Sequence, residues 1–373
     1  MLQIVFPLVM ILVMGGIHLY FYKRVAVRLH LGNKALEILK WLTILNLIGI
    51  FGYLGGRYFL DIPNWLYFIL SLSLGIGFCF FVLTLLYELV HFLIHFIPFD
   101  KNKRAFIKKT SDITVVALGG AYLGTGVYEG SKEPQVVPIT ITQNLFRKPY
   151  RLVQISDMHI GGLIDEEFVK KTVQTINSLD VDFIVITGDL TDAPINQIKE
   201  SVSPLQNLKS KFGTFYIVGN HEYFHGLEDT ISYLKTLNII VLENNSLIIG
   251  AEENRFNIAG LYDYFGYRKE EFAPDVAKVV SQIDKTLPTL LLAHQPKQTE
   301  KLENFKPNLI LSGHTHGGQI FPFAYLVKLQ QPYLKGLYEI SKNEAIYVNS
   351  GIGFWGPKMR LGSSAEITLI TWQ

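Results

Sequence analysis

Apolar residues are concentrated before residue 130, where they form long runs without an amphipathic period. The first run, residues 1–22, carries no charge and is long enough to cross a hydrocarbon core of about 30 Å. Runs at about 36–60 and 65–96 predict two more spans, and a shorter, glycine-rich run at 113–128 predicts either a fourth span or a buried helix. Residues 1–128 are therefore expected to form an all-α transmembrane segment of three or four helices.

The flanking charges predict how these helices are oriented. A cleaved signal peptide is not expected, because the first run lacks a basic start and a small-residue cleavage site. Cytoplasmic loops are rich in lysine and arginine, and two segments fit that rule: Lys23, Arg24, Arg28 and Lys34 after the first run, and Lys101, Lys103, Arg104, Lys108 and Lys109 after the third. The N-terminus is then outside, so residues beyond 129 lie outside the cytoplasm if 113–128 crosses, and face the cytosol if it does not.

The pattern changes after residue 129. Residues 129–150 read as a linker followed by a first strand, and residues 151–373 alternate short apolar strands with amphipathic segments, of which about 165–179 and 196–209 are predicted helices. Apolar strands separated by helices indicate an α/β domain whose strands are buried on both faces. In such folds ligands bind at the carboxyl ends of the strands.

Composition narrows the classes of function. The formal net charge is only +2, which disfavours a nucleic acid as partner. The single cysteine, Cys79, excludes an intrachain disulfide and a cysteine metal site. Glu88, His91 and His95 share one face of the third apolar run and could hold a metal or haem, but no second histidine pair completes such a site, which favours a polar helix end.

The strand ends carry an unusual set of polar residues. Six of the ten histidines follow residue 150, and five of them lie directly after apolar strands, together with three aspartates and an asparagine: His159, His221, His294, His314, His316, Asp157, Asp189, Asp192 and Asn220. A single D-x-H or H-T-H would be weak, but the whole series, each member after a strand, predicts a metal site.

The motifs "DMH", "GDLTD", "GNHE", "LAHQ" and "GHTHGGQ" resemble those of the calcineurin-like metallophosphoesterase superfamily over residues 150–373. The ending "YVNSGIGFWGPKMRLGSSAEITLITW" and the basic "KRAFIKK" before an apolar run are similar to its bacterial membrane-anchored branch. Many of those proteins carry a twin-arginine export signal, which Lys103 and Arg104 replace here. The resemblance implies a four-layer α-β-β-α sandwich.

The chemistry explains why such residues are needed. Two divalent ions that share a carboxylate can clamp both the attacking and the leaving oxygen of a phosphoryl transfer. Residues i and i+2 of an extended chain point the same way, so Asp157 and His159 are expected to grip one ion together, and His314 and His316 to point into one site.

The resemblance also implies the role of each residue. It implies two divalent ions, of manganese, iron, zinc or cobalt, held by Asp157, His159 and His316 on one side and by Asn220, His294 and His314 on the other, with Asp189 shared. A hydroxide bridging the ions would attack phosphorus, and the catalytic residues would be His221, assisting the leaving group, and Asp192, orienting His221. Two alternatives stay open: Asp192 as a helix N-cap before Pro194, and Glu222 as either a supporting partner or a helix-start residue.

Two features bear on the substrate. Ala193 and Pro194 stand where the phosphoprotein phosphatases have Arg-Gly, which favours a phosphodiester or pyrophosphate. The apolar residues Phe321, Phe323 and Tyr325 follow the last histidines and are either core or a lip that dips into lipid headgroups, as is the aromatic run 261–272. We therefore expect a lipid-linked phosphoester, such as a phospholipid, as substrate.

Three other functions are distinguishable. A cytosol-facing UDP-diacylglucosamine pyrophosphatase of lipid A synthesis would use the same chemistry on the other side of the membrane. A non-catalytic membrane scaffold would be expected to have lost ligands, and none is missing from the motifs. A nuclease is disfavoured because no basic stripe is present. The expected location is the inner cell membrane, with several spans and the catalytic domain outside the cytoplasm.

Overall fold

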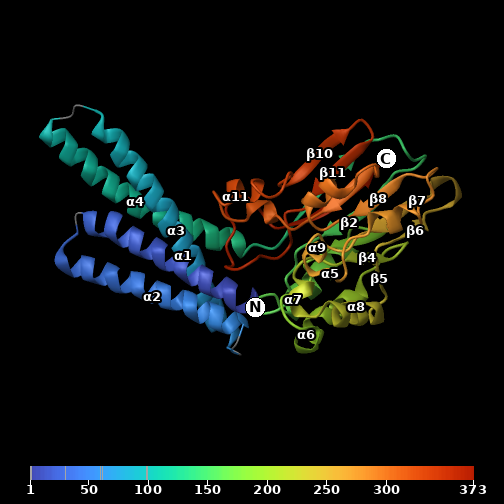
Figure 1. Ribbon diagram of the computed structural model, residues 1–373, viewed down its shortest axis with the longest axis horizontal. Coiled ribbons are helices and arrows are strands. Elements are labelled where there is room, and N and C mark those ends of the chain that lie inside the picture. Colours follow the sequence, from blue (N-terminus) through green and yellow to red (C-terminus); the bar gives the residue numbers. More distant parts are fainter. Residues whose placement is uncertain (1, 30, 59, 61, 98–99) are drawn as a thin grey trace. The chain divides into compact units, whose positions relative to one another are not determined.

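The computed structural model describes residues 2–29, 31–58, 60, 62–97 and 100–373 (Figure 1). Met1 and Phe59, inside the first and second predicted spans, lie outside the described residues. The chain divides into two compact units. The helical unit comprises Met1–Ser131 and Gly356–Leu361, and the α/β unit comprises Lys132–Trp355 and Gly362–Gln373.

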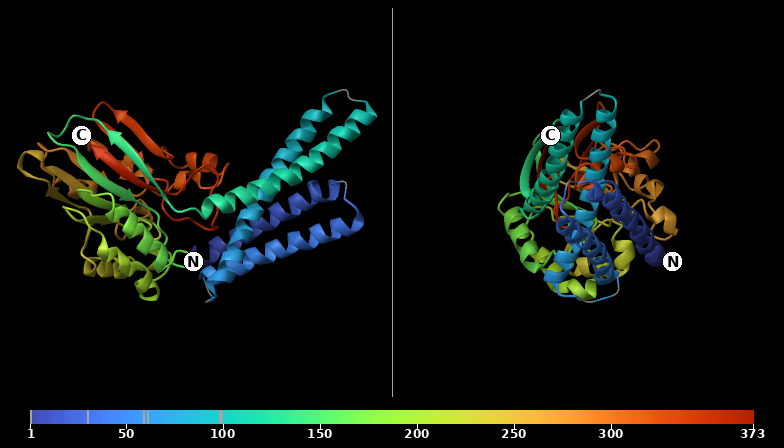
Figure 2. Two further views of the ribbon diagram at one scale, coloured as in Figure 1. Left: turned by 180° about the vertical axis from the view of Figure 1, so that it is seen from behind. Right: turned by 90° about the vertical axis from the view of Figure 1, so that its left-hand side faces the viewer.

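The helical unit contains four long helices: α1 Leu2–Arg24, α2 Asn33–Tyr58, α3 Asn64–His95 and α4 Lys101–Gly130, with a short 3-10 turn η1 Ala26–Arg28. Helix α3 packs against each of the other three (Figure 2). Among the described residues, Leu8–Arg28, Asn33–Arg57 and Asn64–His95 are long and apolar enough to cross a membrane. The predicted segment 113–128 lies inside α4, which is not one of these three, so its crossing stays a prediction.

Helix α4 begins earlier than the sequence suggested. The basic segment 101–109, expected as a loop, forms its first turns. The carboxylate of Asp100 caps the helix by accepting from the backbone N–H of Lys103 at 2.9 Å.

Several polar side chains inside the helical unit are paired with one another. The Asn46 amide of α2 donates to Nε2 of His18 on α1 at 2.9 Å and to the Ser73 carbonyl of α3 at 3.1 Å. Glu88 accepts from Arg24 at 2.8 and 2.5 Å and from Arg28 at 3.2 Å. Such contacts hold helices together in an apolar surrounding. Two arginines thus engage Glu88, and none of the candidate metal groups found among the described residues contains it.

A segment from near the C-terminus completes the helical unit. Met359, in Gly356–Leu361, is buried between α3 and α4. Its side chain fits there because each helix has a glycine at the contact. A Cβ added at Gly75 would lie 2.2 Å from Met359 Sδ, and one at Gly126 would lie 2.8 Å from its Cε. Arg360 is buried beside it and donates its backbone N–H to the Gly126 carbonyl at 2.9 Å.

The α/β unit contains two six-stranded mixed sheets (Figures 1 and 2). The first has the order β1 Gln135–Ile141, β12 Glu366–Trp372, β2 Tyr150–Ile155, β3 Phe183–Thr187, β4 Thr214–Ile217, β5 Ile239–Val241. The second has the order β10 Gly336–Ser341, β11 Glu344–Val348, β9 Leu309–Ser312, β8 Thr289–Leu292, β7 Phe256–Gly260, β6 Asn245–Ile249. The strands that precede the predicted site motifs run parallel within each sheet: β2, β3 and β4 in one, β8 and β9 in the other.

Successive side chains along each strand point to opposite faces of its sheet, and this alternation separates the domain into layers. Leu152, Phe183 and Phe215 of the first sheet pack against Ile258 and Leu290 of the second, forming a core between the sheets. The intervening residues of each strand enter two separate outer cores, which are covered by helices. The predicted four-layer α-β-β-α architecture is confirmed.

Helices α5 Glu166–Asn177, α6 Ile195–Val202 and α8 Leu227–Thr236 cover the first sheet, and α10 Val276–Val280 and the 3-10 turn η4 Pro296–Lys301 pack near the second. The remaining short turns are η2 Ser203–Asn207, α7 Glu222–His225, η3 Glu252–Asn254, α9 Gly266–Lys269, η5 His316–Gly318 and α11 Ala324–Lys328. The predicted helix 165–179 corresponds to α5, whose N-cap is Asp165.

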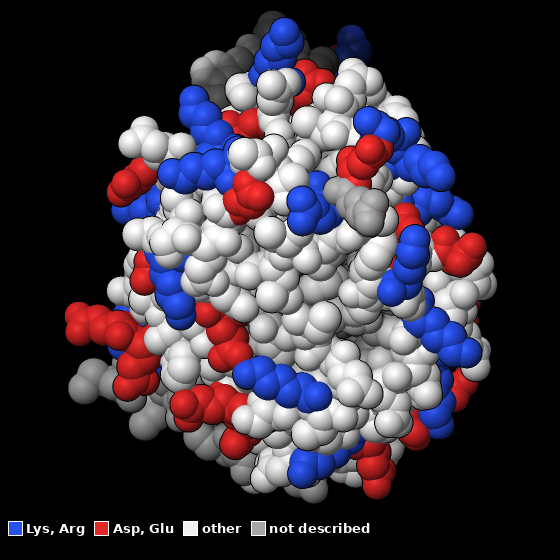
Figure 3. Space-filling view, turned by 90° about the vertical axis from the view of Figure 1, so that its right-hand side faces the viewer, with Lys and Arg blue, Asp and Glu red and all other residues white. Residues whose placement is uncertain are grey.

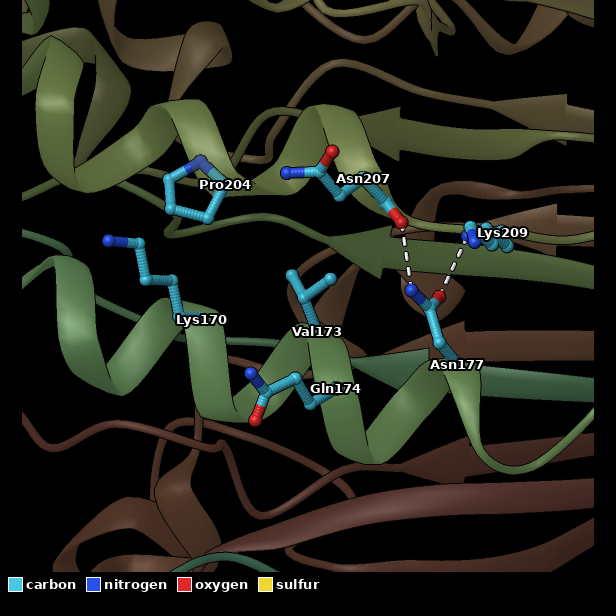
Figure 4. A pocket seen from close by; sticks show the side chains of 7 residues that line it. All are labelled: Lys170, Val173, Gln174, Asn177, Pro204, Asn207 and Lys209. Atoms are coloured by element: carbon cyan, nitrogen blue, oxygen red, sulfur yellow. Dashed lines mark hydrogen bonds between the residues drawn. The ribbon is translucent and has the colours of Figure 1, made fainter.

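The predicted helix 196–209 is wrong as a single element. It is α6 followed by the 3-10 turn η2. Pro204 cannot donate to the carbonyl of Glu200, and its ring crowds that carbonyl. The hydroxyl of Ser203 donates to the same oxygen at 3.0 Å instead. A pocket of about 260 Å³ lies between α5 and η2. The Asn177 side chain bridges it, accepting from the Lys209 N–H and donating to the Asn207 carbonyl, both at 2.8 Å (Figure 4).

Candidate metal centre

Five strands deliver the predicted site residues to one place. Asp157 and His159 follow β2, Asp189 and Asp192 follow β3, and Asn220 and His221 follow β4. His294 follows β8, and His314 and His316 follow β9. Because parallel strands end at the same edge of a sheet, short loops after them can meet there. The structure gathers the aspartates and histidines of this set into overlapping groups.

The backbone at these residues is not extended, contrary to the sequence-based expectation. Asp157, His159, Asp189, His314 and His316 all have positive φ, between 49° and 70°. The paired residues of "DMH" and "HTH" therefore converge through left-handed turns and not through strand geometry. Such conformations cost of order 1–3 kcal/mol each and cluster at functional sites.

Two glycines make room for these turns. A Cβ at Gly219 would lie 2.2 Å from Asp189 Oδ1, and one at Gly313 would lie 2.3 Å from Asp157 Oδ2. Any side chain at these positions would collide with a carboxylate of the site.

The first group consists of Asp157, His159 and His316, whose ligating atoms lie within 4.8 Å of one another. The Nε2 atoms of His159 and His316 are 3.0 Å apart, and His316 Nε2 is 3.5 Å from Asp157 Oδ1. Two imidazoles and a carboxylate thus face a common point.

The second group consists of Asp189, His294 and His314, within the same limit of 4.8 Å. His294 Nε2 lies 3.3 Å from Asp189 Oδ2, and the rings of His294 and His314 are 5.2 Å apart. Asp189 also forms a group with His159 and His221. Its carboxylate therefore takes part in a group with a histidine of each set.

Hydrogen bonds orient the imidazoles. His294 Nδ1 donates to the Thr187 carbonyl at 2.7 Å, and His159 Nδ1 contacts Asp192 Oδ1 at 2.8 Å. With Nδ1 engaged, the Nε2 lone pair of each ring is directed into the site, which is the arrangement that metal-binding histidines adopt.

Asp192 contacts two histidines. Besides His159, its Oδ1 accepts from His221 Nδ1 at 2.5 Å. The alternative of a helix N-cap is wrong, because the N-cap position of α6 is Pro194, with no side-chain cap. Asp192 thus connects His221 to the first group.

Glu222 shapes the loop that carries Asp189. It is fully buried and accepts from the backbone N–H groups of Gly219 at 2.6 Å, Leu190 at 2.8 Å and Thr191 at 3.0 Å. It is also the first residue of α7, so both sequence interpretations apply. Burial and the nearby Asp189 raise the pKa of Glu222, whereas the N–H bonds from Thr191 and Gly219 lower it.

Two of the buried groups, Asp189 and His314, are held in the protonation states that bind a cation. Although burial favours the neutral acid, the neighbouring His294 and His221 hold the pKa of Asp189 well below its usual range. Burial, together with His294, lowers the pKa of His314 to about 3, so this ring is neutral. A carboxylate and a neutral imidazole are the forms that bind a metal.

The donor set fits a pair of divalent ions. Asn220 Oδ1 is buried and accepts no hydrogen bond from any residue that the structure describes, which leaves an amide oxygen to be satisfied. Together with the two buried groups, it makes a set of oxygen and imidazole donors, the mixture that suits manganese, iron, zinc or cobalt.

Sequence reasoning left one histidine of this region unassigned. His225, at the end of α7, lies within 4.8 Å of Asp192 and His221 by their ligating atoms. Its spacing of four residues from His221, across a short helical turn, was the available signal.

The predicted lip is only partly exposed. Phe321 and Tyr325 are 51% and 63% exposed, whereas Phe323 is half-buried. Helix α11, which carries Tyr325, packs against the turn η5 that holds His316. In the second aromatic run, Leu261 is buried and Tyr262 and Phe272 pack on a core, whereas Tyr267 is exposed.

Fold and site together define a metallophosphoesterase, a hydrolase with buried His/Asp metal-site clusters. Residues 150–318 match the family model described as calcineurin-like phosphoesterase. An uncharacterized metallophosphoesterase of Helicobacter pylori is 39% identical over 331 residues, covering 88% of both chains. A Campylobacter jejuni metallophosphoesterase is 31% identical over 99% of this chain and 98% of its own. The chain belongs to the calcineurin-like phosphoesterase family.

A relative from Bos taurus, named a transmembrane protein with metallophosphoesterase domain, is 35% identical over 74% of this chain and 64% of its own length. Among solved structures, a 5'-nucleotidase precursor from Thermus thermophilus is similar at a TM-score of 0.35 and 16% identity, covering 60% of this chain and 55% of that one. The sequence relatives, and not this structural likeness, carry the assignment.

Proposed function

We propose that this protein is a membrane-anchored phosphoesterase that uses two divalent ions to hydrolyse a lipid-linked phosphodiester or pyrophosphate. Asp157, His159 and His316 would hold one ion, and Asn220, His294 and His314 the other, with Asp189 between them. The observation that carries the proposal is the position of Asp189, which belongs to groups containing ligands of both sets.

When bound, the ions would supply Lewis acidity to the phosphoryl oxygens and activate the attacking water. The other steps belong to the protein. His221 Nδ1 donates to Asp192 Oδ1, with 2.5 Å between the two atoms. This hydrogen bond orients the ring so that Nε2 can deliver a proton to the leaving oxygen. The His221 backbone N–H donates to Asp189 Oδ1 at 2.8 Å and so keeps the acid beside the shared carboxylate.

The choice of a diester or pyrophosphate rests on Ala193 and Pro194, which follow Asp192 and carry no charge for a phosphate dianion. The test is hydrolysis of bis(p-nitrophenyl) phosphate and p-nitrophenyl phosphate by the purified full-length protein with manganese. We expect turnover of the diester to exceed that of the monoester, and Asp189→Asn to abolish both. Faster turnover of the monoester would contradict the proposal.

The lipid-linked nature of the substrate rests on the exposed apolar residues beside His316. The variant Phe321→Ser/Tyr325→Ser should raise KM for a micellar short-chain phospholipid about tenfold or more, since each side chain gains about 1.5–3 kcal/mol when buried in lipid. Turnover of the soluble diester should not change. Leu337→Ser, which replaces another exposed apolar residue, is the matched control. Equal effects on both substrates would contradict the lip.

Charge on the surface supports the exclusion of nucleic acid. On the face shown in Figure 3, lysine and arginine are interspersed with aspartate and glutamate, and no continuous basic band crosses it. A nucleic acid would require such a band. The gathered donor set likewise argues against a non-catalytic scaffold.

A further inference from the structure

The cluster formed by Asp192, His221 and His225 lies beside the proposed centre. Its three ligating atoms, one carboxylate oxygen and two imidazole nitrogens, lie within 4.8 Å of one another. His221 is buried, and Asp192 and His225 are half-buried at the solvent side of the site. The cluster is built by the loop after β3 and by α7, where the rings of His221 and His225 are 6.3 Å apart.

This donor set differs from that of the proposed centre. Two histidines, one carboxylate and an open fourth position form a zinc site of the kind found in hydrolases. None of the seven proposed ligands takes part, because Asp192 and His221 were assigned to proton transfer and His225 had no role. We propose that Asp192, His221 and His225 form a third, inhibitory metal site that takes zinc.

The geometry requires only small movements. Ligand atoms around tetrahedral zinc lie about 3.3 Å apart, given bonds of about 2.0–2.1 Å. The contact between Asp192 Oδ1 and His221 Nδ1 is 2.5 Å, so these atoms must separate by about 0.8 Å while the half-buried His225 ring moves inward.

Occupation of this site prevents the proposed proton transfer. The ion takes the place of the hydrogen bond between Asp192 and His221, and it also draws Asp192 away from His159 Nδ1, 2.8 Å distant. With Nδ1 bound to the ion, His221 cannot be the doubly protonated imidazolium, and release of its remaining Nε2 proton would leave an imidazolate. His221 is then too weak an acid to protonate the leaving oxygen. Inhibition therefore rests on the proposed function, whereas the binding of a third ion does not.

The ion should be zinc and not manganese. A site of imidazole and carboxylate donors binds zinc more tightly than manganese, in the usual order of divalent metals. Excess zinc should thus inhibit at concentrations at which excess manganese does not.

The test begins with the full-length protein loaded with two zinc ions. Equilibrium dialysis against increasing zinc should show a third ion per chain, and hydrolysis of the soluble diester should fall over the same range. In His225→Gln the third ion should be lost, and the zinc concentration for half-inhibition should rise about tenfold or more, as expected when a metal site loses a supporting group. Basal turnover should be unchanged.

His95→Gln, which removes an exposed histidine of the helical unit, is the matched control and should behave as the unmodified protein. A third ion retained in His225→Gln, or only two ions in the unmodified protein, would overturn the site. Binding of a third ion without inhibition would overturn the proposal that the ion replaces the hydrogen bond between Asp192 and His221. Fewer than two ions would instead contradict the proposed function.

Discussion

At the scale of single residues, Asp192 is the most connected side chain of the site. It contacts both His221, the proposed acid, and His159, a proposed ligand. The sequence could suggest the first contact through family resemblance, but not the second, because the two partners lie 33 and 29 residues away on different strand ends. Its removal should therefore affect proton transfer first and metal affinity second.

Asp192→Asn should lower kcat for the soluble diester about 10²-fold or more, as expected for the loss of a general acid. KM should stay within about twofold when metal is saturating, because no proposed ligand is removed. His221→Gln should have a similar effect, and the double variant should be no worse than either single one. Multiplying effects would show that the two residues act independently.

Asp263 is a second informative residue. Its Oδ1 accepts from the Phe265 N–H at 2.7 Å and from the Gln295 amide at 2.9 Å. Burial raises the pKa of Asp263 to about 6. The folded state therefore binds the Asp263 proton more tightly than the unfolded chain does. The contribution of this proton to the free energy of unfolding is present below about pH 4 and is lost as the pH rises through 6, a change of about 3 kcal/mol.

Asp263→Asn removes this titration and keeps the acceptor Oδ1. In chelator-treated protein, we expect the Tm of the variant relative to the unmodified protein to rise between pH 5 and pH 7.5. Thermal unfolding in detergent at the two pH values measures it. A constant difference in Tm would show that Asp263 does not titrate in this range.

At the scale of elements, the strands and their ends could be predicted because apolar runs and polar motifs alternate locally. The order of the sheets could not, since β12, residues 366–372, pairs with both β1 and β2, more than 200 positions earlier. The left-handed turns at Asp157 and His316 could not be predicted either, because positive φ is uncommon in residues other than glycine and an Asp or His in the sequence does not indicate it. Pro204 was the available signal for the break after α6.

The turn after β9 offers a test of this tight geometry. In Gly313→Ala the new Cβ would lie 1.9 Å from Ser156 Oγ and 2.3 Å from Asp157 Oδ2, so the Asp157 carboxylate must move. We expect a loss of about 1–3 kcal/mol of stability and weaker binding of one ion. Thermal unfolding and metal analysis measure the two effects.

Gly120→Ala is the control, because a Cβ at Gly120 meets nothing within 4 Å. An unchanged metal content in Gly313→Ala would show that the Asp157 loop tolerates the extra atom.

At the scale of the whole molecule, we predict that the three apolar helices span a membrane and that the side on which the α/β unit lies depends on whether α4 crosses. The lysine and arginine residues before α2 and at the start of α4 predict that both segments are cytoplasmic. If α4 crosses, a C-terminal alkaline phosphatase fusion should be active and a C-terminal green fluorescent protein fusion dark. The opposite pattern would place the α/β unit in the cytosol, as the alternative pyrophosphatase function requires.

The segment Gly356–Leu361 has a consequence for how this protein can be divided. A fragment beginning at Lys132 would retain Met359 and Arg360 but lose Gly75 and Gly126, the floor on which they rest. In this fragment the Met359 side chain would lose the helices against which it packs, and the exposed apolar segment would favour self-association. The four helices therefore cannot be replaced by arbitrary helices. Any replacement would have to provide the same packing site for residues Gly356–Leu361, which follow the helices by more than 200 residues in the sequence.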